Sequence, residues 1–347
     1  MENKTYLNWV SEKSKTSWWH DSADPSELRD ALGMGACGIT TNPMLVKATL
    51  LTSQNEWKGK INTEELLGMD SSERARYLTF EVVKENAKSI EQLHKLNPHR
   101  DGYICAQVDP SLCGSRGEMI AMAKYYNGAG PNIAVKLPAT KAGLDVLEEL
   151  VSIGVTCTAT VSFTYPQVIA VAERHLKGLE RARKNGIQGG ECFAVIMIGR
   201  LDDYLREVVT DNNINISEDD IRQAGLAVTK KAYAVYQKRS YKAHLLVAAL
   251  RGTYHMTELA GADLIVSIRP EYQNILNSSN LPFEELIDKD VPADVIRRLL
   301  AVREFKKAYE ENGMMEEDFI SYGVTQKTLS EFASDGGWKG INDIKFK

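Results

Sequence analysis

One lysine stands inside an uninterrupted apolar run. Lys136 lies in the sequence Ile-Ala-Val-Lys-Leu-Pro at residues 133–138. Lysine is almost never fully buried without a partner, and removal from water disfavours its charged form. A neutral amine is the nucleophile that forms a Schiff base with a carbonyl substrate. The alternative is a structural lysine that reaches the rim of the protein or pairs with Asp21 or Asp109. Residue chemistry alone leaves both interpretations open.

Polar side chains also stand at the ends of other apolar runs. Because side chains alternate along a strand with period two, Thr158 and Thr160 share one face, as do Gln107 and Asp109. Burying each such group without a partner would cost about 1–3 kcal/mol. Polar groups at so many strand ends exceed what packing requires, so we take them as candidate site residues: Asp21, Asn42, Gln107, Thr158, Thr160, Arg200, Arg251 and Ser267.

The elements that must position these residues are eight short apolar runs bounded by Gly, Pro, Asp or Asn. Such runs are typical of buried parallel strands, and they are Thr16–His20, Gly38–Thr41, Tyr103–Val108, Ile133–Leu137, Val155–Val161, Cys192–Ile198, His244–Leu250 and Asp263–Ile268. Segments with helical spacing separate most of them: Ser26–Leu32, Ser71–Lys95, Met119–Tyr126, Gly143–Ser152, Pro166–Lys184 and Glu218–Lys238.

This alternation predicts an α/β fold, a closed (β/α)₈ TIM barrel, with its chemistry at the C-terminal ends of the strands. The competing architecture is an open doubly wound sheet, but no Gly-rich phosphate loop of the GxGxxG or GxxxxGK[ST] type follows the first strand. We expect residues 1–280 to form the barrel. Residues 281–347 should form a C-terminal helical extension, with a charged helix at Ala293–Asn312 and an irregular end. The extension is expected to pack on the barrel or on a second subunit of a homodimer.

The amino-acid composition argues against nucleic acid and membranes as partners. The chain has 347 residues, 43% hydrophobic and 26% charged, and a formal net charge of −5, so no overall field attracts nucleic acid or an anionic membrane. The polar N-terminus does not resemble a secretory signal, and no apolar run approaches the roughly 20 residues of a transmembrane helix. We therefore expect a cytoplasmic location. Five cysteines without a CxxC pair, and histidines without ligand spacing, predict neither disulfides nor a metal site.

The motifs around the candidate residues resemble those of the transaldolases. The resemblance runs through WWHDSAD, GITTNPM, VKLPAT, TCTATVSF, GRLDDYL and AALRG, one per predicted strand, and covers most of the chain. It implies a (β/α)₈ barrel with a Schiff-base lysine on the fourth strand, which agrees with the strand count. It also implies sugar phosphates as substrates and no metal or organic cofactor.

The resemblance further implies a role for each matched residue. Lys136 would attack the ketone, and Asp21 would assist proton transfer when the C3–C4 bond breaks. Asn42 would orient the lysine or the bound three-carbon unit, and Thr160 a water or a substrate hydroxyl. The phosphate would be held by two guanidinium groups, which suit bidentate phosphate contacts: Arg200 and Arg251.

Five positions depart from the family pattern. The family usually carries Glu, acting through water, where this chain has Gln107, which cannot titrate. Thr158 replaces an Asn, and Ala249 replaces a Ser that precedes the strand-seven Arg. Val195 and Met197 replace a Ser and a Phe. Gln at the strand-three position resembles the fructose 6-phosphate aldolase branch, although that branch carries Tyr where Met197 stands.

These departures leave three functions to separate. The leading prediction is a transaldolase-type transferase that moves a dihydroxyacetone unit from a ketose phosphate to an aldose phosphate, as in pentose phosphate pathway chemistry. The first alternative, motivated by Gln107, is a lyase that releases free dihydroxyacetone. The second, motivated by all five departures, is a non-catalytic protein that binds sugar phosphates. Asp109 could replace part of the missing acid–base group, but an Asp before Pro more often opens a turn.

Overall fold

A computed structural model describes residues 5–346, and its centre is a parallel sheet of seven strands. The strands are β1 (Ser17–His20), β2 (Ile104–Gln107), β3 (Ile133–Pro138), β4 (Cys157–Thr160), β5 (Cys192–Met197), β6 (His244–Ala248) and β7 (Ile265–Ile268). They are ordered β1-β7-β6-β5-β4-β3-β2. Every pair is parallel, which confirms the α/β fold class and seven of the eight expected strands.

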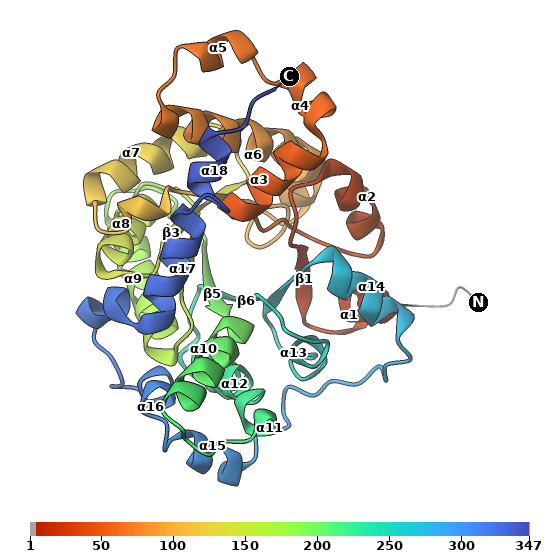
Figure 1. Ribbon diagram of the computed structural model, residues 1–347, viewed down its shortest axis with the longest axis vertical. Helices are drawn as coiled ribbons and strands as arrows, with labels where there is room; N and C mark the ends of the chain where they lie inside the picture. Colours follow the sequence, from red (N-terminus) through yellow and green to blue (C-terminus); the bar gives the residue numbers. More distant parts are fainter. Residues whose placement is uncertain (1–4, 347) are drawn as a thin grey trace.

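The eighth strand is reduced to a single residue that closes the barrel. Ile39 forms parallel bridges with His20 on one side and Ile104 on the other, and so joins the two edges of the sheet. The prediction of a full strand at Gly38–Thr41 is wrong because Asn42 caps a helix at once, accepting hydrogen bonds from the backbone of Met44 and Leu45. Figure 1 shows the helices arranged around these central strands.

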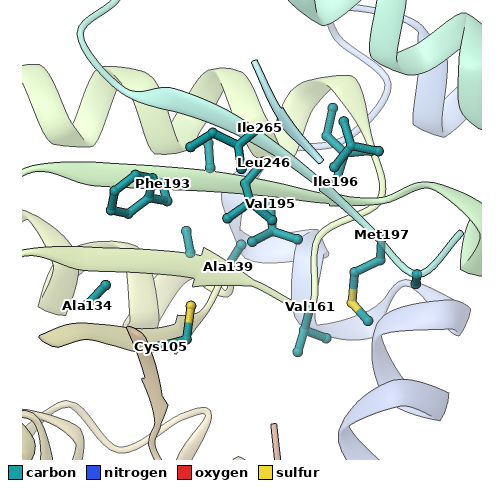
Figure 2. Close-up of a cluster of buried hydrophobic side chains, with 14 of the residues drawn as sticks. Cys105, Ala134, Ala139, Val161, Phe193, Val195, Ile196, Met197, Leu246 and Ile265 are labelled. Carbon is teal, nitrogen blue, oxygen red and sulfur yellow. The ribbon is translucent and has the colours of Figure 1, made fainter. Parts of the chain in front are cut away.

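The barrel interior is a packed apolar core away from the C-terminal ends of the strands. Trp19 and Phe193 are fully buried and contact edge to face, with ring centroids 4.7 Å apart. A Cβ atom on Gly38 would overlap the Trp19 indole, so the closing segment requires glycine there. Phe193, Val195 and Met197 follow one another along β5, as Figure 2 shows. Their side chains lie inside the barrel, and the polar residues lie nearer the C-terminal ends of the strands.

Helices connect and cover the strands. Before β2 lie α1 (Tyr6–Lys13), α2 (Pro25–Gly33), α3 (Pro43–Thr52), α4 (Gln54–Lys60), α5 (Thr63–Leu67) and α6 (Ser71–Leu96). Between β2 and β6 lie the short helix η1 (Pro110–Leu112), α7 (Arg116–Asn127), α8 (Lys141–Ser152), α9 (Tyr165–Lys184), α10 (Ile198–Asp211), α11 (Glu218–Ile221) and α12 (Ala224–Arg239). The remaining helices are α13 (Tyr254–Thr257), α14 (Pro270–Ser278), α15 (Ala293–Leu299), α16 (Arg303–Tyr309), η2 (Glu316–Ser321), α17 (Gly323–Ala333) and α18 (Trp338–Asn342).

Three helix predictions require correction. The helix expected at Glu218–Lys238 divides into α11 and α12, and the one at Ala293–Asn312 divides into α15 and α16. The end of the chain is not irregular: α17 packs against η1, α3 and α10, and α18 packs against α3 and α6. Buried Phe332 and Trp338 supply the apolar contacts that make these helices stable. Within the predicted extension, α15 and α16 also contact α12. Residues 1–4 and 347 of the predicted ranges lie outside the described residues.

No helix in the described part of the chain combines the length and the apolar character needed to cross a membrane.

Because His20 and His175 are buried, we expect the free energy of unfolding to fall in acid. Burial lowers the pKa of both His20 and His175 to about 4, against about 6.5 in an unfolded chain. Between these values the unfolded chain binds protons that the folded chain does not, so the free energy of unfolding falls as pH falls from 6.5 towards 4. For each histidine the loss between pH 7.5 and pH 5 should be about 2 kcal/mol.

Urea unfolding at the two pH values measures this effect. His175→Gln should remove about 2 kcal/mol of the pH dependence, whereas Gln188→Asn, at an exposed residue that does not titrate, should leave it unchanged. An undiminished pH dependence in His175→Gln would contradict the assignment.

Candidate active site

A cavity of about 350 Å³ lies at the C-terminal ends of the barrel strands. Six of the predicted site residues line it: Asp21, Asn42, Lys136, Thr160, Arg200 and Ser267. Three do not: Gln107, Thr158 and Arg251. The other lining residues are Thr40, Met44, Leu45, Ala48, Val195, Met197, Leu246, Ala248, Ala249, Arg269 and Phe332. The cavity therefore has a polar side on β7, β1 and the closing segment, and an apolar wall on β5 and β6.

Lys136 reaches this cavity from within β3. Its side chain is only 7% exposed, and its amine donates a hydrogen bond to the backbone carbonyl of Thr41 at 2.8 Å. Neither Asp21 nor Asp109 forms an ion pair with it within the described residues. The lysine is thus a buried amine held by one main-chain oxygen and open to a cavity, rather than the structural ion-pair partner that the sequence left open.

Asp21, which also lines the cavity, belongs to a series of three hydrogen-bonded polar side chains. Its Oδ1 accepts a hydrogen bond from the Thr40 hydroxyl at 2.7 Å, and that hydroxyl is 2.5 Å from the Ser267 hydroxyl. Arg269 approaches the other carboxylate oxygen at 3.8 Å. Because Trp19 pairs with Ser267 in the β1–β7 register, Asp21 and Arg269, each two residues further, lie at the same level of the barrel.

The remaining strand-end residues divide between the cavity and the core. Asn42 lines the cavity, but its Oδ1 caps α3. Thr158 is fully buried beneath the cavity, with its hydroxyl 3.5 Å from the Cys105 sulfur. Gln107 is beside Lys136 in the β2–β3 register and 4% exposed, and its Oε1 has no hydrogen-bond partner in the described structure. Asp109 caps the turn η1 through two hydrogen bonds of 2.8 Å from Ser111, so it opens a turn.

Arg200 lies in the first turn of α10 and is held by the C-terminal extension. Its Nη1 donates to Glu331 at 2.6 Å and to Thr328 at 3.3 Å. Its guanidinium stacks over the Phe332 ring at 5.3 Å from the centroid. Since Phe332 also lines the cavity, α17 forms part of the wall above Lys136.

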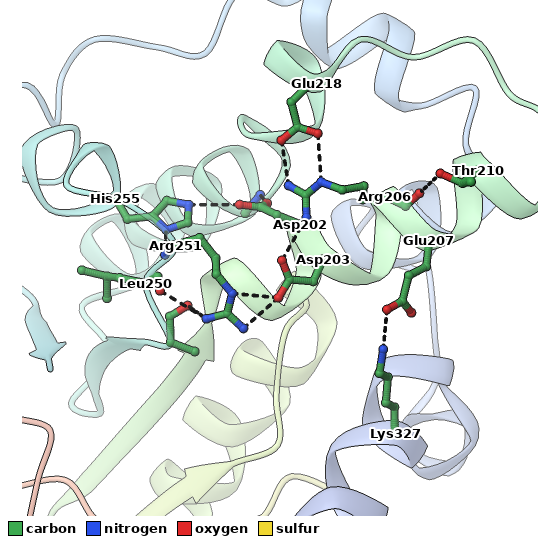
Figure 3. Close-up of polar contacts among 12 residues, drawn as sticks. Asp202, Asp203, Arg206, Glu207, Thr210, Glu218, Leu250, Arg251, His255 and Lys327 are labelled. Carbon is green, nitrogen blue, oxygen red and sulfur yellow. Dashed lines mark hydrogen bonds and ion pairs between the residues drawn. The ribbon is translucent and has the colours of Figure 1, made fainter. Parts of the chain in front are cut away.

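Arg251 points into an adjacent cavity of about 320 Å³, which it shares with Arg200, Asp203 and Glu331. Its Nε donates to Asp203 at 2.7 Å, and its Nη1 donates to the carbonyls of Ala249 and Leu250. Figure 3 shows the guanidinium turned towards Asp203. Gly199 permits this close approach, because a Cβ atom there would overlap the Arg251 side chain.

A buried Asp–His pair fixes the backbone at Arg251. The backbone N–H of Arg251 donates to His255 Nδ1 at 3.1 Å, so the other ring nitrogen carries the proton and donates to Asp202 at 3.0 Å. Asp202 and His255 are both fully buried. Burial raises the pKa of Asp202 above its usual value, although the hydrogen bond with His255 opposes this shift. Among residues 5–346 there is no group of three His, Cys, Asp or Glu side chains that could hold a metal ion.

Two non-glycine residues beside the site adopt left-handed backbone conformations. Val161 directly follows Thr160 and has φ +55°, and Ala249 has φ +61°. For a β-branched residue this conformation is costly, on the order of 1–3 kcal/mol, and it persists only where surrounding contacts impose it. The end of β4 is therefore held in a strained shape next to a cavity-lining threonine.

Sequence reasoning missed three polar or aromatic cavity residues: Thr40, Arg269 and Phe332. Two of them carried a signal. Arg269 stands two residues after Ser267, on the same face of the strand, and Thr40 belongs to the segment that includes Asn42. Phe332 had none, because only the packing of α17 brings it to the barrel mouth.

Comparison with known proteins places this arrangement in a family. The family model described as Transaldolase/Fructose-6-phosphate aldolase matches residues 18–337. Transaldolase of Thiobacillus denitrificans is 23% identical over 339 residues, 93% of each chain. Transaldolase 1 of Streptomyces avermitilis is 27% identical over 205 residues, 58% of this chain and 54% of that protein. Transaldolase 1 of Streptomyces coelicolor is 26% identical over 204 residues, 58% of this chain and 53% of that protein. The chain thus spans about half the length of the Streptomyces relatives. It belongs to the transaldolase/fructose-6-phosphate aldolase family.

Proposed function

We propose that the protein is a Schiff-base transferase that moves a dihydroxyacetone unit from a ketose phosphate to an aldose phosphate. The observation that carries the proposal is the buried amine of Lys136 in a cavity that also contains the Asp21 carboxylate. Family membership supports transferase or aldolase chemistry of this kind. Cytoplasmic location, pentose phosphate pathway chemistry and a homodimer remain predictions.

The reaction follows from these groups. The Lys136 amine adds to the ketone carbon, and loss of water gives an iminium. A base removes the proton from the C4 hydroxyl, the C3–C4 bond breaks, and its electron pair moves into the iminium to give an enamine. The aldehyde fragment leaves, and the enamine carbon then attacks the aldehyde of the acceptor, which takes up the proton. Hydrolysis of the new imine frees Lys136. In this proposal Asp21 carries the proton, and Thr160 positions a water or a hydroxyl; both residues line the cavity.

A second candidate function has its own observation. Gln107, beside Lys136 in the register, cannot act as an acid or a base, and it is buried away from the cavity. In a lyase the enamine carbon takes up a proton from water instead of attacking an acceptor aldehyde, and hydrolysis of the iminium then releases dihydroxyacetone. The candidate is therefore a lyase with the same imine intermediate.

One experiment separates these functions. The protein is incubated with fructose 6-phosphate, with and without erythrose 4-phosphate, and the products are measured. The transferase proposal predicts turnover that requires the acceptor. Free dihydroxyacetone at the same rate without acceptor would support the lyase. Failure of borohydride to trap any adduct with fructose 6-phosphate or dihydroxyacetone would contradict both and leave a sugar-phosphate binding protein.

A further inference from the structure

A second arginine enters the cavity from a strand that carries no motif of the resemblance. Arg269 follows the end of β7 and lines the same cavity as Lys136 and Arg200. Its side chain is half exposed, at 50%, so it stands at the mouth rather than in the core. Among the described residues it forms an ion pair with Asp21 at 3.8 Å, which is longer than the 2.7–2.9 Å of a charge-assisted hydrogen bond. The guanidinium therefore keeps donors for a further anion.

Arg251, in contrast, is engaged by its own chain through all three guanidinium nitrogens. Nε and Nη2 contact Asp203, each at 2.7 Å, and Nη1 donates to two backbone carbonyls. It does not line the cavity that contains Lys136. A bidentate phosphate contact with Arg251 would have to displace the carboxylate or the carbonyls.

The wall between Arg200 and Arg269 carries no acidic side chain; the ion pair of Arg200 with Glu331 lies on the other side, in the neighbouring cavity. The wall is formed by Ala248 and Ala249 of the β6 end, which carry no polar side-chain atom. An anion in this cavity would therefore meet a guanidinium from the β5 side and another from the β7 side. On its outer side Arg269 borders a groove that includes Asp24, Glu27 and Glu271, which would repel an anion. Asp21 lines both spaces, but the cavity contains no other carboxylate, so the charge pattern favours an anionic group on the inner side.

We propose that Arg269, together with Arg200, binds the anionic group of the substrate and replaces Arg251 in that role. The inference rests on the proposed function in that the anion is the phosphate of a sugar phosphate. Loops after the last two strands of a TIM barrel, with the N-terminus of a following helix, are a common phosphate site, and Arg269 directly precedes α14. Arg269 is thus a specificity-determining residue that discriminates phosphorylated from neutral carbonyl substrates.

The test compares Arg269→Gln with Arg251→Gln, and uses Arg183→Gln as a control at an exposed arginine near the C-terminal end of α9. Borohydride trapping is titrated with fructose 6-phosphate and with neutral dihydroxyacetone. The readout is the ratio of the two half-saturating concentrations. For Arg269→Gln this ratio should rise about 10- to 100-fold, on the scale of one charged hydrogen-bond partner. Arg251→Gln should change it less, and Arg183→Gln not at all.

Two results would overturn the inference. One is a ratio in Arg269→Gln equal to that of the control. The other is an equal loss with both ketones, which would mean that Arg269 supports the site without recognising the anionic group. Failure of the proposed function has a different signature, because the unmodified protein would then form no adduct with either ketone. In that case calorimetric titration with inorganic phosphate tests the anion site alone, and an affinity unchanged by Arg269→Gln would refute it.

Discussion

Replacing Lys136 with methionine is expected to abolish both turnover and adduct formation. Methionine keeps most of the volume of the buried side chain but has no nucleophilic amine, so no imine can form. The activity loss should be on the order of 10⁴-fold or more, as for removal of a covalent nucleophile in other enzymes. The folded structure should survive with a cost of about 1–3 kcal/mol, because the Thr41 carbonyl loses its hydrogen-bond donor.

Intact mass after borohydride reduction with fructose 6-phosphate checks this result. Lys124→Met, at an exposed position of α7, is the matched control and should retain the adduct. Urea unfolding of both variants shows whether the fold is preserved. An adduct of normal yield on folded Lys136→Met would place the nucleophile at another lysine.

Asp21→Asn is expected to have the second largest effect, and a different one. Asparagine keeps the shape of the side chain and the oxygen that accepts from Thr40, but it does not take up the proton released from the substrate hydroxyl. Loss of a general acid–base group costs about 10²- to 10⁴-fold in rate. Because imine formation uses the amine of Lys136, the trapped adduct should still appear while cleavage products do not.

Parallel measurement of adduct yield and product release distinguishes this result from simple misfolding. Asp30→Asn, at an exposed position of α2, provides the control and should match the unmodified protein in both readouts. Product release in Asp21→Asn within threefold of the unmodified protein would exclude Asp21 as the proton carrier.

Local patterns predicted most of the barrel because its strands are short apolar runs with clear boundaries. The main errors came where one element gives way directly to another. Asn42 and Pro43 form the cap and first residue of α3, and so end the closing segment before it becomes a strand. Likewise α10 begins at Ile198 immediately after β5, which places Arg200 on a helix instead of at a strand end. The cap of α3 was visible in the sequence; the direct passage from β5 to α10 was not.

The site was predictable where it depends on strand period and unpredictable where it depends on distant partners. Lys136 and Ser267 lie on inward faces that alternation assigns. The partners of the two arginines follow no local pattern, because Glu331 is 131 residues from Arg200 and Asp203 is 48 residues from Arg251. These ion pairs arise from the packing of α17 and from the bend at Ala249. Residue type alone therefore did not show which arginine faces the cavity.

The main-chain oxygen that holds Lys136 has a consequence for how the protein tolerates mutation. Every residue type has a backbone carbonyl, so no side-chain substitution at Thr41 can remove the oxygen that accepts the hydrogen bond from Lys136. The path of the backbone from Gly38 to Asn42, set by the Ile39 bridges and the cap of α3, determines where that oxygen lies. Side-chain substitution at Thr41 should therefore disturb the nucleophile little, whereas one residue inserted or deleted between Gly38 and Asn42 would displace it. The position of the Lys136 amine therefore depends more on the number of residues between the Ile39 bridges and the cap of α3 than on the side chain at Thr41.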